Sequence, residues 1–197
     1  MSKSDPSAIK KERNKTIRWV VTIFIVTILI SATISFASTN LMEISPNILK
    51  FIILLVIVFV GIIFDVVGVA VTSADEKPFH SMAARKVAGA QESIMLLRNA
   101  ERVSSICNDV IGDICGVISG SASAAIAAVL IRDYTGTVQQ IIMLGMSALV
   151  AGLTVGGKAI GKTYAIRSCT SIVTFAGKIV WFFRSPSRLF SKNHKNK

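Results

Sequence analysis

Three acidic residues stand inside long apolar runs of this sequence and are the residues best suited to chemistry. Asp65 interrupts the apolar run 51–74, and Asp109 and Asp113 interrupt the run 103–131. A carboxylate within a membrane-spanning segment is costly, so such residues usually face the interior of a helix bundle and mark an ion path. Carboxylate and hydroxyl oxygens are the ligands that Mg²⁺ prefers. The pattern therefore predicts a site for a hard divalent cation.

Small and hydroxyl residues recur at helical spacing around these carboxylates. Steps of three and four residues place Gly61, Gly68 and Thr72 on the same helical face as Asp65. Because small residues let helices approach closely within lipid, we expect the second, third and fourth apolar runs to pack together with their carboxylates inward. The corresponding small faces are Ser105, Asp109, Gly112, Asp113, Gly116 and Gly120 on the third run, and Gly145, Gly152 and Gly156 on the fourth.

A structural role for the same carboxylates is the alternative interpretation. Each Asp could cap a broken helix, or it could form an ion pair with Lys158 or Arg102 that holds the bundle together. Charged residues inside membranes commonly pair with one another. The residues by themselves leave both interpretations open.

Four apolar runs are long enough to place these residues within a bilayer, since a spanning helix needs about 20 mostly apolar residues. They cover residues 19–37, 51–74, 103–131 and 134–157. Only 17% of the residues are charged, where a soluble domain has about 25%. A fifth segment, 165–183, has an apolar and a polar side and carries Trp181 near its end, which predicts an interfacial helix. The predicted fold is an all-α membrane protein with four transmembrane helices plus a juxtamembrane amphipathic helix.

The formal net charge of +11 lies in the connections and tails, outside the apolar runs. No nucleic-acid-binding motif accompanies it, so the expected partner is membrane lipid and not nucleic acid. With the N-terminus inside the cell, the outer connections 38–50 and 132–133 hold only Lys50 and Arg132, leaving 20 of the 22 Lys and Arg residues inside or at inner helix ends. The positive-inside rule therefore predicts a multi-pass protein of the cell membrane with both termini in the cytoplasm.

The segments outside the main apolar region have characters of their own. Residues 1–18 form a basic N-terminus, 19–37 an extra transmembrane anchor, and 184–197 a basic tail. The first run also has the basic start of a signal peptide, but it is longer than the hydrophobic region of such a peptide, which has about 7–15 residues. We therefore expect an uncleaved anchor. Residues 81–99 predict a partly amphipathic cytoplasmic helix with Gly89 inside it.

No residue pattern indicates an enzyme or a resident cofactor. The two histidines, His80 and His194, lie in polar segments, and no nucleophile–base arrangement stands in a supporting context. Residues 156–163 match the phosphate-loop spacing Gly-x-x-x-x-Gly-Lys-Thr, but they close a membrane span instead of following a soluble strand. The three cysteines are expected to serve as small apolar side chains; they are Cys107, Cys115 and Cys169.

Several short motifs follow one another in a definite order, and their members are Ser73-Ala74-Asp75-Glu76, then Leu96-Leu97 with Arg102, then Ser104, Ser105 and Asn108, and finally Gly157 to Lys162. Through these motifs, from about Phe51 to Phe183, the chain resembles the transmembrane domain of the cyclin-M, CorB and CorC family of magnesium transport proteins. That family carries Ser-Ala-Ser-Glu, Leu-Leu-x-x-x-x-Arg, hydroxyl residues with an Asn, and Gly-Glu-x-x-Pro-Lys at the matching places. The resemblance makes 51–183 one transmembrane domain.

The resemblance implies three spans with a juxtamembrane helix, a homodimer, and an inward-facing cavity that binds Mg²⁺. It carries Ser73 and Asn108 over as ligands, but Lys158 stands where the family has Glu and Gly161 where it has Pro. The CBS-pair domain that members usually carry does not follow within this sequence. With the acidic residues added, the predicted metal ligands are Ser73, Asn108, Asp65, Asp109 and Asp113.

The favoured function is therefore that of a divalent cation transporter domain, for Mg²⁺ or Co²⁺. The substituted Lys158 and Gly161 favour an alternative, a transport-inactive relative that acts as a membrane interaction or assembly protein. An unrelated small membrane protein, for example a pore-forming or stress-related one, is a third hypothesis. No resident cofactor is expected, and Mg²⁺ is the ion that is transported or bound.

Overall fold

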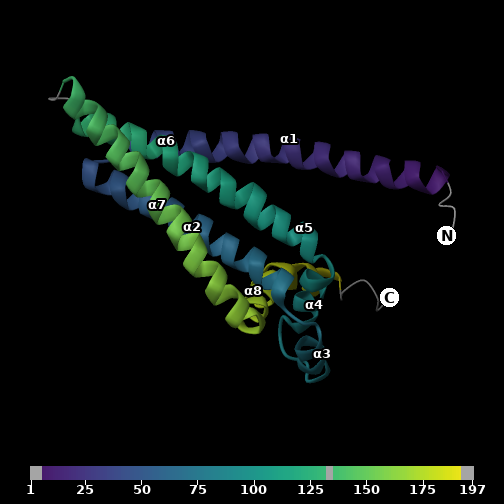
Figure 1. Cartoon of the computed structure of the whole chain (residues 1–197). Helices are drawn as coiled ribbons and strands as arrows, with labels where there is room; N and C mark the ends of the chain where they lie inside the picture. Colours follow the sequence, from purple (N-terminus) through teal and green to yellow (C-terminus); the bar gives the residue numbers. More distant parts are fainter. Residues whose placement is uncertain (1–5, 132–134, 192–197) are drawn as a thin grey trace. The chain divides into compact units, whose positions relative to one another are not determined.

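The computed structural model of the chain describes residues 6–131 and 135–191, and no strand occurs within them. The predicted outer connection at Arg132 and Asp133 lies outside the described residues, as do the two ends of the chain, 1–5 and 192–197. The elements in chain order are α1 (Pro6–Ile44), α2 (Asn47–Ser73), α3 (Lys77–Ala84), α4 (Ala90–Arg98), α5 (Ala100–Ser105), η1 (Ile106–Gly112), α6 (Asp113–Leu130), α7 (Thr137–Arg167) and α8 (Cys169–Ser191). Figure 1 labels the α-helices.

Four helical stretches are long and apolar enough to cross a membrane, judged by length and composition. They are Thr16–Met42, Asn47–Ser73, Ala100–Leu130 and Thr137–Arg167. Each is longer than the about 20 residues that a spanning helix needs. The predicted all-α membrane fold with four spans is confirmed.

The chain divides into two compact units, 1–50 and 51–197. The first unit contains α1, which runs without a break from Pro6 and is therefore longer than the predicted anchor 19–37. The hydroxyls of Thr22 and Thr33 donate to the carbonyl oxygens of Arg18 and Leu29, one turn earlier. These bonds satisfy the hydroxyls within the helix itself, as an apolar surrounding requires.

The third span is a continuous helix with an irregular centre. It begins as α5, widens into the π-helical segment η1 over Ile106–Gly112, and continues as α6. A π-helical segment changes the register of the side chains that follow it, and such segments are frequent at functional sites. The residues that face the bundle after η1 therefore differ from those that regular helical steps predict.

The predicted single helix over 81–99 is wrong, because the structure divides this region into α3 and α4. Lys86 and Gly89 have φ values of 56° and 84° in the turn between them. A left-handed backbone ends a right-handed helix, and glycine adopts it without steric penalty. Gly89 therefore ends one helix and begins the next.

Helices α4 and α8 approach each other closely at two glycines, Gly89 and Gly177. A Cβ added to Gly89 would lie 2.6 Å from the backbone nitrogen of Lys178, and one added to Gly177 would overlap the hydroxyl of Ser93. The Ser93 hydroxyl donates to the carbonyl oxygen of Val173 across this contact, at 3.1 Å. Figure 1 shows α8 beside α4. Around them lies the core formed by Ala70, Val71, Phe79, Leu97, Ala165 and Val173.

The amphipathic segment predicted over 165–183 is a helix, but it starts later and ends later. α7 continues to Arg167, and α8 begins at Cys169 and passes through Pro186 to Ser191. Its buried side, with Val173, packs on α4, and its opposite side exposes Phe175, Ile179 and Phe182 at helical spacing. The phosphate-loop spacing at 156–163 lies wholly inside α7. A helix interior has no free backbone N–H groups to bind phosphate, so the structure excludes that interpretation.

A buried ion-pair network as the candidate functional site

Asp65 lies in the interior of the bundle and is only 3% exposed. It stands on α2 among valines and isoleucines, eight residues before Ser73, or about 12 Å along the axis from the end of the helix. The prediction that this carboxylate points inward is confirmed. A carboxylate so placed needs partners, because water cannot solvate it there.

Two lysines of α7 supply those partners. Lys158 Nζ lies 3.8 Å from Oδ1 of Asp65, and Lys162 Nζ lies 4.0 Å from Oδ2. Because the lysines are four residues apart, the helix presents both on one face. Two unit charges 4 Å apart interact by about 4 kcal/mol at an effective dielectric constant of 20. The negative charge of Asp65 is therefore compensated by one lysine beside each of its two carboxylate oxygens.

Lys158 also reaches a second carboxylate. Its Nζ lies 4.0 Å from Oδ1 of Asp113, the first residue of α6. The ammonium group thus links all three helices of the bundle, α2, α6 and α7. Ion pairing of these carboxylates with Lys158, the alternative interpretation of the sequence, is what the structure shows for Asp65 and Asp113.

Glycines create the space for this network. A Cβ added to Gly112 would lie 3.4 Å from Nζ of Lys158 and 4.0 Å from Oδ1 of Asp65. On α7, a Cβ at Gly157 would overlap the side chain of Ile62, and one at Gly161 would come within 2.6 Å of Val66. Close packing of α7 against α2 at these glycines brings the two lysines within reach of Asp65.

Asn108 of η1 packs on α2 at Gly68, three residues after Asp65. Its side chain packs directly on Gly68, where a Cβ would overlap the amide oxygen. The amide Nδ2 donates to the hydroxyl of Ser104 at 3.1 Å. Oδ1 is buried and accepts no hydrogen bond within the described residues, and the same holds for Oδ2 of Asp65. Two oxygen atoms suited to a cation are therefore left with acceptor capacity.

The other two acidic residues do not point into the bundle as predicted. Asp109 is exposed, and its Oδ2 accepts a hydrogen bond from Ser105 Oγ at 2.8 Å. The Asp113 side chain is 73% exposed, although one of its oxygens lies near Lys158. Asp109 lies within the π-helical segment η1 and Asp113 directly after it, so neither follows the regular helical spacing from which the inward face was predicted.

The predicted small face of α2 is correct for Gly61, Asp65 and Gly68 but not for the exposed Thr72, and the faces predicted on the other two helices are largely wrong. Gly61 packs against Cys115, and Gly68 against Asn108, as expected of a close helix contact. In contrast, no atom lies within 4 Å of a Cβ added at any of five predicted contact glycines, which are Gly116, Gly120, Gly145, Gly152 and Gly156. The contact face of α7 is formed by Gly157 and Gly161, one residue further round the helix.

The five predicted metal ligands are not gathered around one point. Ser73 is exposed at the end of α2, and the described residues contain no group of three or more His, Cys, Asp or Glu side chains that could hold a metal ion. Asp65 and Asp113 share Lys158 as a partner, and Asn108 packs on Gly68, three residues after Asp65 on α2. The metal site therefore stays a prediction, and Lys158 and Lys162 occupy the space beside its most buried carboxylate.

Lys162 is the site residue that sequence reasoning missed. In the sequence it stands only as the last residue of the motif 157–162, whereas Lys158 stands out because the resembling family has Glu at that place. The available signal was the spacing of the two lysines, four residues apart on a helix with Gly157 and Gly161 one position before each of the lysines. A small residue beside each lysine is what close approach to an acidic helix requires.

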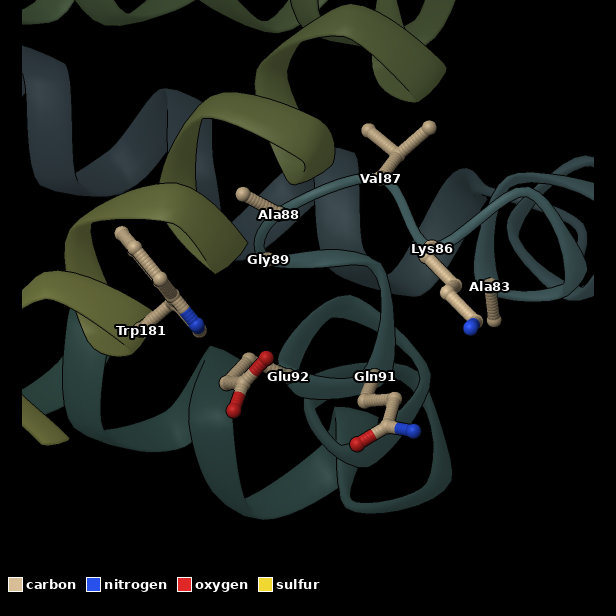
Figure 2. Close-up of a pocket in the computed structure, with 8 residues that line it drawn as sticks. All are labelled: Ala83, Lys86, Val87, Ala88, Gly89, Gln91, Glu92 and Trp181. Atoms are coloured by element: carbon tan, nitrogen blue, oxygen red, sulfur yellow. The ribbon is translucent and has the colours of Figure 1, made fainter. Parts of the chain in front are cut away.

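A separate hollow of about 250 Å³ lies between the α3–α4 turn and α8. Figure 2 shows Trp181 and Glu92 close to one another at one end, and Lys86 with Gln91 at the other. None of the five predicted metal ligands lines this hollow. It is therefore distinct from the network around Asp65.

No family model, curated protein or solved structure matches the chain. The resemblance to the cyclin-M, CorB and CorC family stays a prediction that depends on the order of the motifs.

Proposed function

We propose that this chain is a multi-pass membrane protein that binds and transports a divalent cation, with Mg²⁺ as the first candidate. The observation that carries the proposal is the Asp65 carboxylate, buried where α2, η1 and α7 meet in a bundle of apolar helices. Ionisable residues in such positions mark ion paths by default. The proposal treats α2, α5–η1–α6 and α7 as the transport unit.

Three further observations support the same assignment. Asp65 Oδ2 and Asn108 Oδ1 have no hydrogen-bond partner in the described chain and are ligand types that Mg²⁺ accepts, and Asn108 packs on Gly68, three residues after Asp65. The π-helical segment occurs beside them, at Ile106–Gly112. The motif order also resembles that of a magnesium transport family, in which the positions of Ser73 and Asn108 bind the ion.

A transport-inactive role is the second candidate, and one specific observation favours it. Lys158 and Lys162 already compensate Asp65, so the network holds the helices together without a metal ion. In that case the bundle serves as a membrane interaction or assembly unit. The ion pairs would then contribute to stability alone.

The proposed location is the cell membrane, with both termini in the cytoplasm. The distribution of Lys and Arg supports this orientation. A C-terminal green fluorescent protein fusion and a C-terminal alkaline phosphatase fusion test it in bacteria. Fluorescence without phosphatase activity is expected, and the reverse result would place the C-terminus outside.

The resemblance further suggests a homodimer as the working state. The exposed apolar residues of α7, such as Leu144, Val155 and Ile160, need either lipid or a second copy as cover. Light scattering of the detergent-solubilised protein, corrected for bound detergent, measures the mass. A dimer mass is expected, and a monomer mass would remove this part of the proposal.

The test of cation binding uses the full-length protein in detergent. Thermal unfolding is followed while Mg²⁺ is titrated, with Ca²⁺ and Na⁺ as comparison ions. A ligand that binds only the folded state stabilises it by about 2.7 kcal/mol at 100 times its dissociation constant. We expect a saturable shift with Mg²⁺ that Asp65→Asn removes. Asp75→Asn, in the exposed turn after α2, is the matched control and should keep the shift.

Proteoliposomes loaded with a Mg²⁺-sensitive dye then measure transport itself. Uptake that depends on intact Asp65 supports the transporter. Binding without uptake, or no shift at any attainable Mg²⁺ concentration, favours the transport-inactive relative.

A further inference from the structure

The charges around Asp65 balance one another. Asp65 and Asp113 provide two negative charges, and Lys158 and Lys162 provide two positive charges within 4.0 Å of their oxygens. A balanced cluster attracts Mg²⁺ weakly, and adding the ion would leave two uncompensated positive charges beside the buried Asp65 carboxylate. A divalent cation can therefore bind beside Asp65 only when positive charge leaves.

The two ammonium groups are held in a way that lets them leave. Their distances from the Asp65 oxygens, 3.8 and 4.0 Å, exceed the 2.7–3.2 Å typical of an N–H···O hydrogen bond. The Lys162 side chain is 54% exposed and the Lys158 side chain 21%. Both lysines lie in the last turns of α7, where a flexible four-carbon stem can carry the charge toward the membrane interface.

Two buried oxygen atoms, one on α2 and one on η1, could receive the ion. Oδ2 of Asp65 is buried, and among the described residues it accepts no hydrogen bond. Oδ1 of Asn108, whose side chain packs on Gly68 of α2, is also buried and accepts no hydrogen bond among these residues. These atoms come from two different helices, so the ion would lie at the contact between α2 and η1.

We propose that Lys158 and Lys162 are tethered counter-cations, and that one Mg²⁺ ion displaces both ammonium groups from Asp65. This inference rests on the proposed function. Two positive charges leave and two arrive, so the cluster stays neutral in the loaded and the unloaded state. The buried aspartate is thus never left uncompensated in the membrane while the site waits for an ion.

Mg²⁺ binding by lysine variants tests the displacement, with isothermal titration calorimetry of the full-length protein as the readout. Lys158→Met removes one charge and keeps most of the side-chain volume, so we expect the Kd for Mg²⁺ to fall at least tenfold. Lys162→Met should lower the Kd less, because Lys162 is more exposed, and the double variant should bind most tightly. Lys77→Met on the exposed surface of α3 is the control, with an unchanged Kd.

A second variant distinguishes loss of fold from loss of the mechanism. Asp65→Asn/Lys158→Met removes both charges of the pair, and we expect it to fold and to bind no Mg²⁺. Should Lys158→Met give no folded protein, Lys162→Met decides by the same criterion. An unchanged Kd in both lysine variants, with binding still abolished by Asp65→Asn, would overturn the counter-cation role and leave the proposed function intact. Absence of Mg²⁺ binding in the wild type and in every lysine variant would overturn both.

Discussion

Lys158 of α7 and Asp65 of α2 face each other across the bundle, with Nζ 3.8 Å from Oδ1. Gly112 of η1 provides the space beside them. Neither side chain can exchange its partner for bulk water as readily as a surface residue can, since both stand within apolar helices. The pair should therefore matter more than a surface ion pair, which contributes about 0–1 kcal/mol.

Breaking this pair from one side should destabilise the fold. Asp65→Ala leaves two buried or half-buried ammonium groups without their carboxylate, and removing one member of a buried pair costs about 3–5 kcal/mol. Asp65→Ala/Lys158→Met should recover a large part of that loss. Unfolding by SDS in mixed micelles measures it, with exposed Glu101→Ala as a control expected within about 0.5 kcal/mol of the wild type. Equal losses in the single and double variants would contradict a coupled pair.

Two neighbouring glycines of α7 should respond oppositely to the same substitution. Gly157→Leu forces the side chain into Ile62 and separates α7 from α2, whereas Gly156 has no atom within 4 Å of an added Cβ. Overpacking costs about 1–3 kcal/mol, so Gly157→Leu should be destabilised by that amount and Gly156→Leu should not. The same unfolding assay compares them. A greater loss at Gly156 would mean that the packed face of α7 has been assigned incorrectly.

Gly89 should tolerate no side chain. Gly89→Ala places a Cβ on a residue with φ of 84° and 2.6 Å from the backbone of α8. The left-handed conformation alone costs about 1–2 kcal/mol, and the α8 backbone cannot move aside as a side chain can. Gly116→Ala, in the regular helix α6 with open space around it, should be neutral or stabilising by up to about 1 kcal/mol. Thermal unfolding of both variants decides the comparison.

Gly68 should control the position of Asn108. Gly68→Ala places a Cβ where the Asn108 amide oxygen lies, so this side chain must rotate. If Asn108 contributes to Mg²⁺ binding, the Kd should rise by about tenfold, as is typical when the support of a metal ligand is altered. Gly120→Ala, which meets no neighbouring atom, should leave the Kd unchanged. Titration calorimetry provides the measurement, and equal affinity in both variants would remove Asn108 from the site.

The exposed apolar side of α8 should contact lipid. Trp181 lines the hollow beside α4, so Trp19→Phe/Trp181→Phe/Phe182→Trp places a single tryptophan on the exposed side of α8. Brominated lipids quench a tryptophan that reaches the acyl chains, and interfacial amphipathic helices bury their apolar side about 5–10 Å deep. We therefore expect quenching of the tryptophan introduced at position 182 after reconstitution. Full fluorescence in brominated lipid would place α8 away from the bilayer.

The sequence predicted the features that depend on composition along the chain. The four spans and the helical amphipathic segment follow from runs of apolar residues and from helical spacing, and the structure confirms them. The inward position of Asp65 was also predictable, because glycines surround it at regular steps on α2. The break between α3 and α4 was not predicted from the sequence. It depends on the left-handed backbone conformations of Lys86 and Gly89.

Side-chain partners on the third and fourth helices required the tertiary structure. Regular spacing assigned Gly116 and Gly145 to helix contacts, but η1 changes the register of one helix, and α7 turns Gly157 and Gly161 toward α2. A shift of one residue rotates the contact face of a helix by about 100°. The apolar composition of the helix does not predict which of these faces is in contact.

The sequence by itself determined that this protein is a helical membrane protein with acidic residues inside its spans. A long apolar run has one stable solution in a bilayer, since every backbone N–H and C=O must be satisfied within the helix. Only the tertiary structure decided that Asp65 is held by Lys158 and Lys162, while Asp109 lies outside. Which charges meet depends on the rotation of each helix about its axis, and that rotation is fixed by packing between residues that are distant in the sequence.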